Sequence, residues 1–170
     1  MLSVKVQDAL NAQINLELLS SYHYLAMAAH FESVSLPGMA RWMRVQSDEE
    51  RFHAMKLFDH MCDRGGTVVL QPIEQPRRDF DSALSVFEAA LANERKVTGA
   101  INSLYALAQQ ESDYPSQVLL QWFITEQVEE EKTAQQAIDQ LKMAGKDPSA
   151  ILMLDQLFGN RPAADMESGQ

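Results

Sequence analysis

The sequence predicts an all-α protein, in which four long helices form a bundle with one long crossover and a short fifth helix follows. Three observations support this prediction. Apolar residues recur at helical spacing in four long stretches. The 7 Gly and 6 Pro of the 170 residues gather mainly between those stretches. One link is long and the others are short, which is the pattern of a bundle with a single crossover.

The first helix is expected to begin after Ser3, a residue type that caps helix N-termini. Its apolar stripe passes through Val6, Leu10, Ile14, Leu18, Leu25 and Ala28. The breaker at 35–38 ends this helix, and Pro37 begins the next one. The second helix is predicted over 37–64 and stops at Gly65, a residue type that ends helices.

The link over 65–80 contains Pro72, Pro76 and a short β-prone run at 67–70. Compact domains seldom keep so long a link that is not helical. A helix of about 28 residues is roughly 42 Å long, and about 16 extended residues reach roughly 50 Å. The link can therefore run the length of the bundle and leave the second and third helices parallel, whereas the short links force antiparallel neighbours.

The third helix is predicted from 81 or 82 to 111, and the turn at 113–115 separates it from the fourth, which ends at Gly145. Pro148 then restarts a short helix to about residue 158. We expect one domain over 1–158, with a flexible tail of small and polar residues over 159–170.

The chain is acidic, with 24 acidic and 14 basic residues and a formal net charge of −10. This balance speaks against nucleic acid or an anionic membrane as partner and favours cations. No stretch approaches the roughly 20 apolar residues that span a bilayer, and the first residues do not resemble a secretory signal. The single Cys62 excludes an internal disulfide framework, so we expect a cytoplasmic protein.

Each long helix carries a glutamate in the middle of its inward stripe. Glu94 is the clearest, because its neighbours at helical spacing are apolar and an unpaired buried carboxylate is costly. Glu17, Glu50 and Glu130 take matching positions in the other helices. His53 follows Glu50 by three residues and shares its face. The bundle should therefore collect four carboxylates and one imidazole at mid-height.

Such a cluster suits divalent iron or manganese better than metals that prefer sulfur, and it leaves positions open for dioxygen. The chain has no Cys/His quartet for structural zinc. Glu50 is the natural bridge between two metals about 3.5–4 Å apart, because His53 on the same helix supplies the next ligand. Tyr24 is a candidate hydrogen-bond partner or one-electron donor.

These residues resemble those of bacterial-type non-haem ferritins, and the resemblance extends from about residue 5 to residue 158. It rests on Glu17, Tyr24, the run 49–53, Glu94 and the run 126–130. The resemblance implies a ferroxidase centre. Glu17, Glu50 and His53 would hold the first iron. Glu50, Glu94 and Glu130 would hold the second, with Gln127 close by.

The resemblance also implies a third iron site beside the pair, matched here by Glu49, Glu126 and Glu129 with Glu130 shared. Members of this family oxidise Fe(II) with dioxygen and store the ferric mineral in a shell of 24 subunits. The physiological oxidant, oxygen or peroxide, stays open. Bacterioferritins carry a haem-ligating methionine directly after the bridging glutamate, where this chain has Arg51. We therefore expect iron but no haem.

Two other functions compete with iron storage. A di-iron oxidase or peroxidase would act on a separate substrate, and it usually has a second Glu-x-x-His pair on the fourth helix, where this chain reads Gln-Val-Glu-Glu at 127–130. A structural helical module would keep its inward carboxylates hydrogen-bonded and free of metal. The size of the assembly separates these functions, because only the storage protein forms a large shell.

Overall fold

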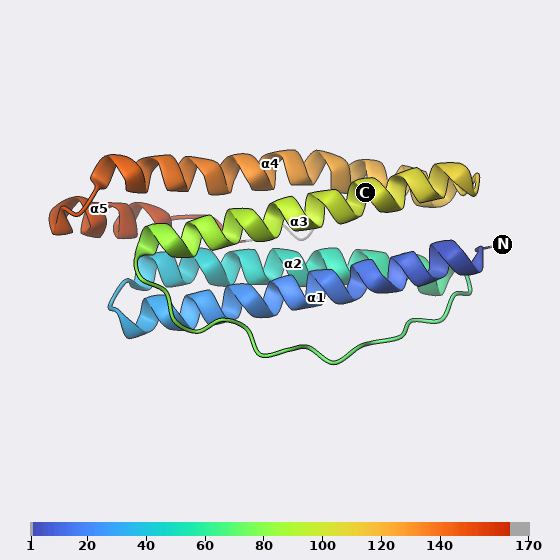
Figure 1. The fold of residues 1–170 in the computed structure, drawn as a ribbon, viewed down its shortest axis with the longest axis horizontal. Coiled ribbons are helices and arrows are strands. Elements are labelled where there is room, and N and C mark those ends of the chain that lie inside the picture. Colours follow the sequence, from blue (N-terminus) through green and yellow to red (C-terminus); the bar gives the residue numbers. More distant parts are fainter. Residues whose placement is uncertain (1, 164–170) are drawn as a thin grey trace.

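A computed structural model describes residues 2–163 and confirms the four-helix bundle with one crossover and a short fifth helix (Figure 1). The helices are α1 Val4–Ser33, α2 Pro37–Asp63, α3 Ala83–Gln110, α4 Tyr114–Ala144 and α5 Pro148–Gly159. The crossover leaves α2 and α3 parallel, while α1 with α2 and α3 with α4 are antiparallel pairs. Among the described helices, none is long and apolar enough to cross a membrane.

The helix ends follow the local sequence signals. The Ser3 side chain accepts a backbone N–H of the first turn of α1. Ser82 and Ser85 cap α3 reciprocally, each hydroxyl accepting the other residue's backbone N–H at 3.1 Å. Gly65 and Gly145 have φ values of 68° and 60°, a left-handed conformation that glycine adopts without strain. The observed boundaries lie within two residues of the predicted ones.

The crossover lies along α1 and is held there by side-chain amides (Figure 1). Asn11 accepts the Val69 N–H at 2.7 Å and donates to the Thr67 carbonyl at 2.9 Å. Asn15 repeats the pattern, with the Gln71 N–H at 2.7 Å and the Val69 carbonyl at 2.9 Å. These bonds satisfy the extended backbone without a second strand. The β-prone run therefore becomes an extended segment rather than a strand.

The apolar core is divided into two clusters along the bundle. The cluster near α5 includes Tyr24, Phe31, Met39, Met43, Phe87, Leu91, Ala134 and Phe158. The cluster at the other end includes Leu10, Ile14, Leu57, Val97, Ile101, Leu120 and Phe123. On every long helix the predicted ligands fall between these two groups, for example Glu94 between Leu91 and Val97. A polar layer thus interrupts the core at mid-height.

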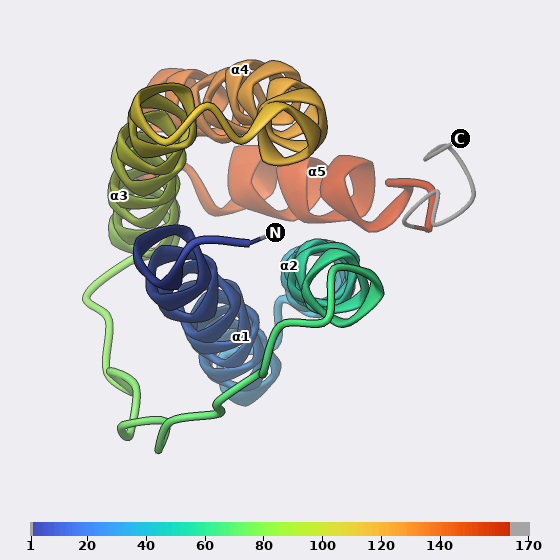
Figure 2. The same cartoon turned by 90° about the vertical axis from the view of Figure 1, so that its right-hand side faces the viewer.

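The short helix α5 packs mainly on α2 and also contacts α4, and it lies between these two helices at one end of the bundle (Figure 2). Gly38 allows this approach, because a Cβ there would lie 1.8 Å from the Asp155 carbonyl oxygen. The Asp155 carboxylate in turn accepts the Met39 N–H at 2.8 Å and caps the start of α2. The docking of α5 therefore depends on a glycine.

The flexible tail was predicted over 159–170, and positions 164–170 lie outside the described residues. Within the described part, Gly159 is the last residue of α5. Arg161 follows it and contacts side chains of α2. The start of the predicted tail is therefore joined to the bundle by specific contacts.

Candidate metal centre

The four predicted glutamates and His53 meet in the polar layer of the bundle. Glu17, Glu50 and Glu94 are completely buried, and His53 and Glu130 expose 3% and 8% of their surface. One ligand atom from each of Glu17, Glu50 and His53 lies within 4.8 Å of the other two. Two carboxylates and an imidazole from α1 and α2 can therefore surround a single cation.

The atoms that would bind this cation lack other partners. Among the described residues, Glu17 Oε2, Glu50 Oε2 and His53 Nδ1 are buried without a hydrogen bond to any side chain outside the cluster, while Glu17 and Glu50 interact with each other. Buried polar atoms in native proteins are nearly always hydrogen-bonded, so three such atoms in one cluster require an explanation. A bound divalent cation would supply it, and oxygen and imidazole donors fit Fe(II).

The other carboxylate oxygens are oriented by glutamine side chains. Gln13 donates to Glu17 Oε1 at 2.8 Å, and Gln46 lies 3.4 Å from Glu50 Oε1. Each glutamine precedes its glutamate by four residues and so shares its helical face. These contacts fix one oxygen of each carboxylate and leave the other free, which is how residues around a metal site orient its ligands.

Glu94 and Glu130 form the α3 and α4 side of the centre and are hydrogen-bonded. The Tyr24 hydroxyl donates a hydrogen bond to Glu94 Oε1, and the Gln127 amide donates one to Glu94 Oε2 at 3.2 Å. Gln46 donates to Glu130 Oε2 at 2.6 Å. Tyr24 therefore partners the carboxylate of α3 and not that of Glu17 on its own helix. The predicted neighbour Gln127 is buried beside the carboxylate it was expected to accompany.

The predicted third-site residues are placed unequally. Glu126 has a ligand atom within 4.8 Å of those of His53 and Glu130, which makes a second possible metal group. Glu49 is partly buried and contacts Arg161. Glu129 is exposed, and its carboxylate lies 3.4 Å from the Lys132 ammonium. The structure thus brings Glu126 to the centre and leaves Glu129 on the surface.

Burial controls the protonation of the ligands. It raises the pKa of Glu17 to about 7 and that of Glu130 to about 8, and the neighbouring Glu94 adds to both shifts. The pKa of Glu50 is raised well above its ordinary value by burial and by the surrounding carboxylates. Burial lowers the pKa of His53 to about 4, so its imidazole is neutral at pH 7. The metal-free centre therefore holds protons that a cation can displace.

Two residues of this region do not figure in the predicted ligand set. Gln46 is fully buried and contacts both Glu50 and Glu130. Its position four residues before Glu50 could have revealed it, because the two side chains share a helical face. Arg161 reaches the same region from beyond α5, and helical spacing gives no signal for a contact of that kind.

The chain is similar to ferritins over nearly its full length. The family model for the ferritin-like domain matches residues 7–144. A bacterial non-heme ferritin of Staphylococcus epidermidis is 39% identical over 161 residues, which are 95% of this chain and 97% of that protein. A bacterial non-heme ferritin of Staphylococcus aureus is 36% identical over the same shares of the two chains.

A solved structure shows the same similarity in three dimensions. The crystal structure of an open pore ferritin from the hyperthermophilic archaeon Archaeoglobus fulgidus superimposes with a TM-score of 0.94. It is 44% identical and covers 95% of this chain and 99% of its own. Sequence and structure comparisons therefore agree on one family.

Proposed function

The chain belongs to the ferritin family, and from this premise we propose that it oxidises Fe(II) at its buried carboxylate centre and stores the ferric product. The observation that carries the proposal is the set of three buried ligand atoms without partners, on Glu17, Glu50 and His53. A metal-free structural module would pair these atoms with hydrogen-bonding groups of neighbouring side chains, and the described residues around the cluster provide none. In this account iron is the substrate and the cargo of the protein.

The proposed centre holds two Fe(II) ions in each chain. Glu17, Glu50 and His53 would bind the first. Glu50, Glu94 and Glu130 would bind the second; all three are buried, and the Gln46 side chain contacts both Glu50 and Glu130. Glu50 would bridge the pair. Two Fe(II) ions release one electron each, and dioxygen or peroxide accepts both electrons.

In this proposal, some side chains of the centre release a proton when Fe(II) binds, and others keep theirs. Carboxylates bind a cation in their ionised form, so Fe(II) binding releases the protons held on Glu17, Glu50 and Glu130. The neutral His53 offers a lone pair without losing a proton at pH 7. Tyr24 keeps its hydroxyl proton, because burial and nearby carboxylates raise its pKa, and it orients Glu94. Its use as a one-electron donor stays a prediction.

The third iron site is proposed at the outer edge of the pair. Glu126 and the shared Glu130 support it, because their ligand atoms approach each other and that of His53. Glu49 would complete it after leaving Arg161, and Glu129 after turning away from Lys132. The full assembly is proposed to be a cytoplasmic shell of 24 copies with no haem.

One observation keeps a di-iron oxidase as the second candidate. A cavity of about 300 Å³ between α3 and α4 is lined by Thr98 and Gln127, and Gln127 contacts Glu94. A small organic substrate could approach the carboxylates through this cavity. Such an enzyme would return its iron to the resting state after each turnover and would not accumulate a mineral.

Adding a large excess of Fe(II) in air tests storage directly. We expect the iron to elute with the protein in size-exclusion chromatography, at the mass of about 24 chains of 19.1 kDa each. Light scattering gives the mass, and iron analysis of the same fractions gives the load. The same addition to buffer without protein is the control. Iron that precipitates while the protein elutes as a monomer or dimer would refute the storage function.

A further inference from the structure

Arg161 lies two residues beyond α5 and contacts the outer side of the metal centre. Its Nη2 is 2.6 Å from Glu49 Oε2, and its Nη1 donates to Gln46 Oε1 at 2.8 Å. The guanidinium carbon lies 4.5 Å from the centre of the Trp42 ring. Only 17% of the Arg161 side chain is exposed. The guanidinium is therefore held by an ion pair, a hydrogen bond and an aromatic face.

Gln46 connects this arginine to two ligands of the centre. Its Oε1 accepts from Arg161, so its amide nitrogen is directed to the other side. That nitrogen donates to Glu130 Oε2 at 2.6 Å and lies 3.4 Å from Glu50 Oε1. Without the guanidinium, the Gln46 amide could turn and present its oxygen to these carboxylates. Arg161 thus fixes the orientation of a side chain that positions Glu50 and Glu130.

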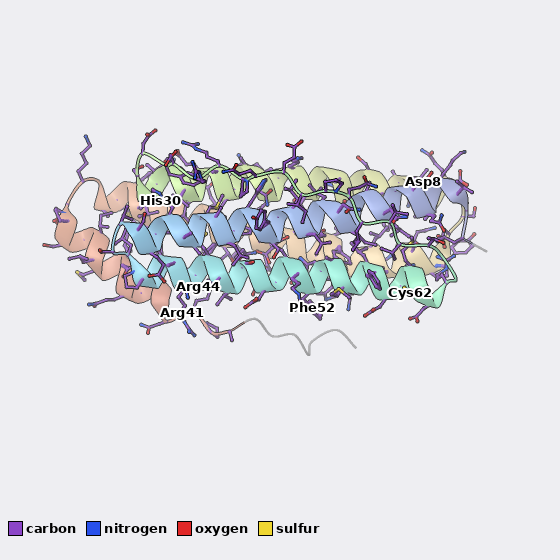
Figure 3. All side chains as sticks on the ribbon, turned by 90° about the horizontal axis from the view of Figure 1, so that it is seen from below. Asp8, His30, Arg41, Arg44, Phe52 and Cys62 are labelled. Atoms are coloured by element: carbon purple, nitrogen blue, oxygen red, sulfur yellow. The ribbon has the colours of Figure 1, made fainter. Side chains whose placement is uncertain are left out.

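The packing of α5 on α2 places Arg161 beside Glu49 and Gln46. Gly38 permits the contact between α5 and α2, and Asp155 caps α2 from α5. Arg41 Nη2 lies 3.5 Å from the Arg161 carbonyl oxygen. Figure 3 shows Arg41 and Arg44 on α2 beside the end of α5. The position of Arg161 is therefore set by a docked helix.

We propose that Arg161 is a positioning residue that holds Glu49 in the metal-free protein and competes with the third cation for its carboxylate. The guanidinium occupies Glu49 Oε2 and neutralises the carboxylate charge that would attract a cation. The guanidinium and the third cation therefore cannot bind this oxygen at the same time. Each lowers the affinity of the Glu49 carboxylate for the other by the same factor. The inference rests on the proposed function, because it assigns Glu49 to a third cation beside the pair.

This competition orders the filling of the centre. Within the described residues, the cluster of Glu17, Glu50 and His53 offers ligand atoms that have no hydrogen bond outside the cluster to give up, so it can accept metal first. The outer position fills last, because its carboxylate must first leave Arg161. When it fills, the Arg161 side chain is released from Glu49 while α5 can stay docked through Asp155.

Titration of the assembled metal-free protein with Zn(II) alone tests the inference, because Zn(II) undergoes no redox reaction. The variant Arg161→Gln removes the charge, and isothermal calorimetry measures each binding step. We expect the weakest step to tighten about tenfold or more, since a hydrogen bond to a charged group is lost from the competing state. The tighter steps should stay within about twofold, because the side-chain amide introduced by Arg161→Gln can still donate to Gln46 Oε1 and keep Gln46 oriented toward Glu50 and Glu130. Arg44→Gln removes the same charge from an exposed position on α2 and should change no step.

Tryptophan emission supplies a second readout that does not depend on affinity. Arg161 lies over the buried Trp42, so its release during the weakest step should change the emission of the unmodified protein. The same step should change the emission of Arg161→Gln by less, because only the response of Trp122, which packs against His53, is left. The contribution of Trp122 is common to both proteins and cancels in the comparison.

The outcomes separate the two proposals. A protein that binds no Zn(II) at its carboxylates overturns the metal centre itself. A second outcome is that the first ions bind tightly while the weakest Zn(II)-binding step has the same affinity in both proteins or is absent from both. This result overturns the role of Arg161 and leaves the di-iron centre intact. A weakest step that is tighter in Arg161→Gln, or present only in that variant, supports the competition.

Discussion

Replacing Glu50 by alanine is expected to slow the oxidation of the first two Fe(II) ions in each chain by about a hundredfold or more. Even residues that only orient metal ligands contribute about 10–100-fold, and Glu50 is proposed to bind both irons. Its Oε2 is one of the three buried ligand atoms without a partner. Stopped-flow absorbance of ferric iron, at two Fe(II) per chain, measures the effect.

A matched variant separates this effect from general damage. Glu88 is an exposed glutamate of α3, and Glu88→Ala should oxidise iron at the unmodified rate. Glu50→Ala should also keep or raise the thermal stability of the metal-free protein, because it removes a buried carboxyl that its neighbours repel. Early kinetics that stay unchanged in Glu50→Ala would exclude Glu50 as the bridge.

The metal-free protein is expected to lose about 3 kcal/mol of stability between pH 6.5 and pH 8.5. Burial raises the pKa of Glu17 to about 7 and that of Glu130 to about 8, from 4.5 in the unfolded chain. The folded state therefore holds more protons in this window, and ionisation on raising the pH destabilises it. Below pH 6.5 the lowered pKa of His53 acts in the opposite direction, because the unfolded chain then binds the extra proton.

Thermal unfolding in a chelating buffer at several pH values measures this slope. Glu130→Gln should flatten it, because the amide stays neutral and can still accept the hydrogen bond from Gln46. The exposed Glu88→Gln should leave it unchanged. Saturating Zn(II) should restore the stability lost at pH 8.5, since a ligand that binds only the folded state stabilises it. A slope that is the same in Glu130→Gln would contradict the assigned pKa shift.

Much of the fold was readable from local signals. Ser3, Pro37, Gly65 and Gly145 act within a few residues of the backbone they cap or end, so their effects do not depend on the rest of the chain. The structure of the run at 67–70 was harder to predict. Its partners are amides of α1 more than fifty residues away, and no local pattern indicates that pairing.

The candidate site was predictable where it depends on helical spacing. Glu17, Glu50, His53, Glu94 and Glu130 lie on inward stripes, and the bundle brings these stripes together. Residues at the edge of a stripe were less certain, and Glu129 proves to lie on the exposed side of α4. Arg161 could not be predicted, because its contact depends on the path of the chain after α5.

Anomalous diffraction at the iron absorption edge locates the metal centre in crystals that are grown and soaked with Fe(II) in the absence of oxygen. We expect two iron peaks in each chain, within the polar layer between the two apolar clusters. One should be bound by Glu17, Glu50 and His53, and the other by Glu50, Glu94 and Glu130. Iron peaks confined to surface carboxylates, with none in this layer, would contradict the account.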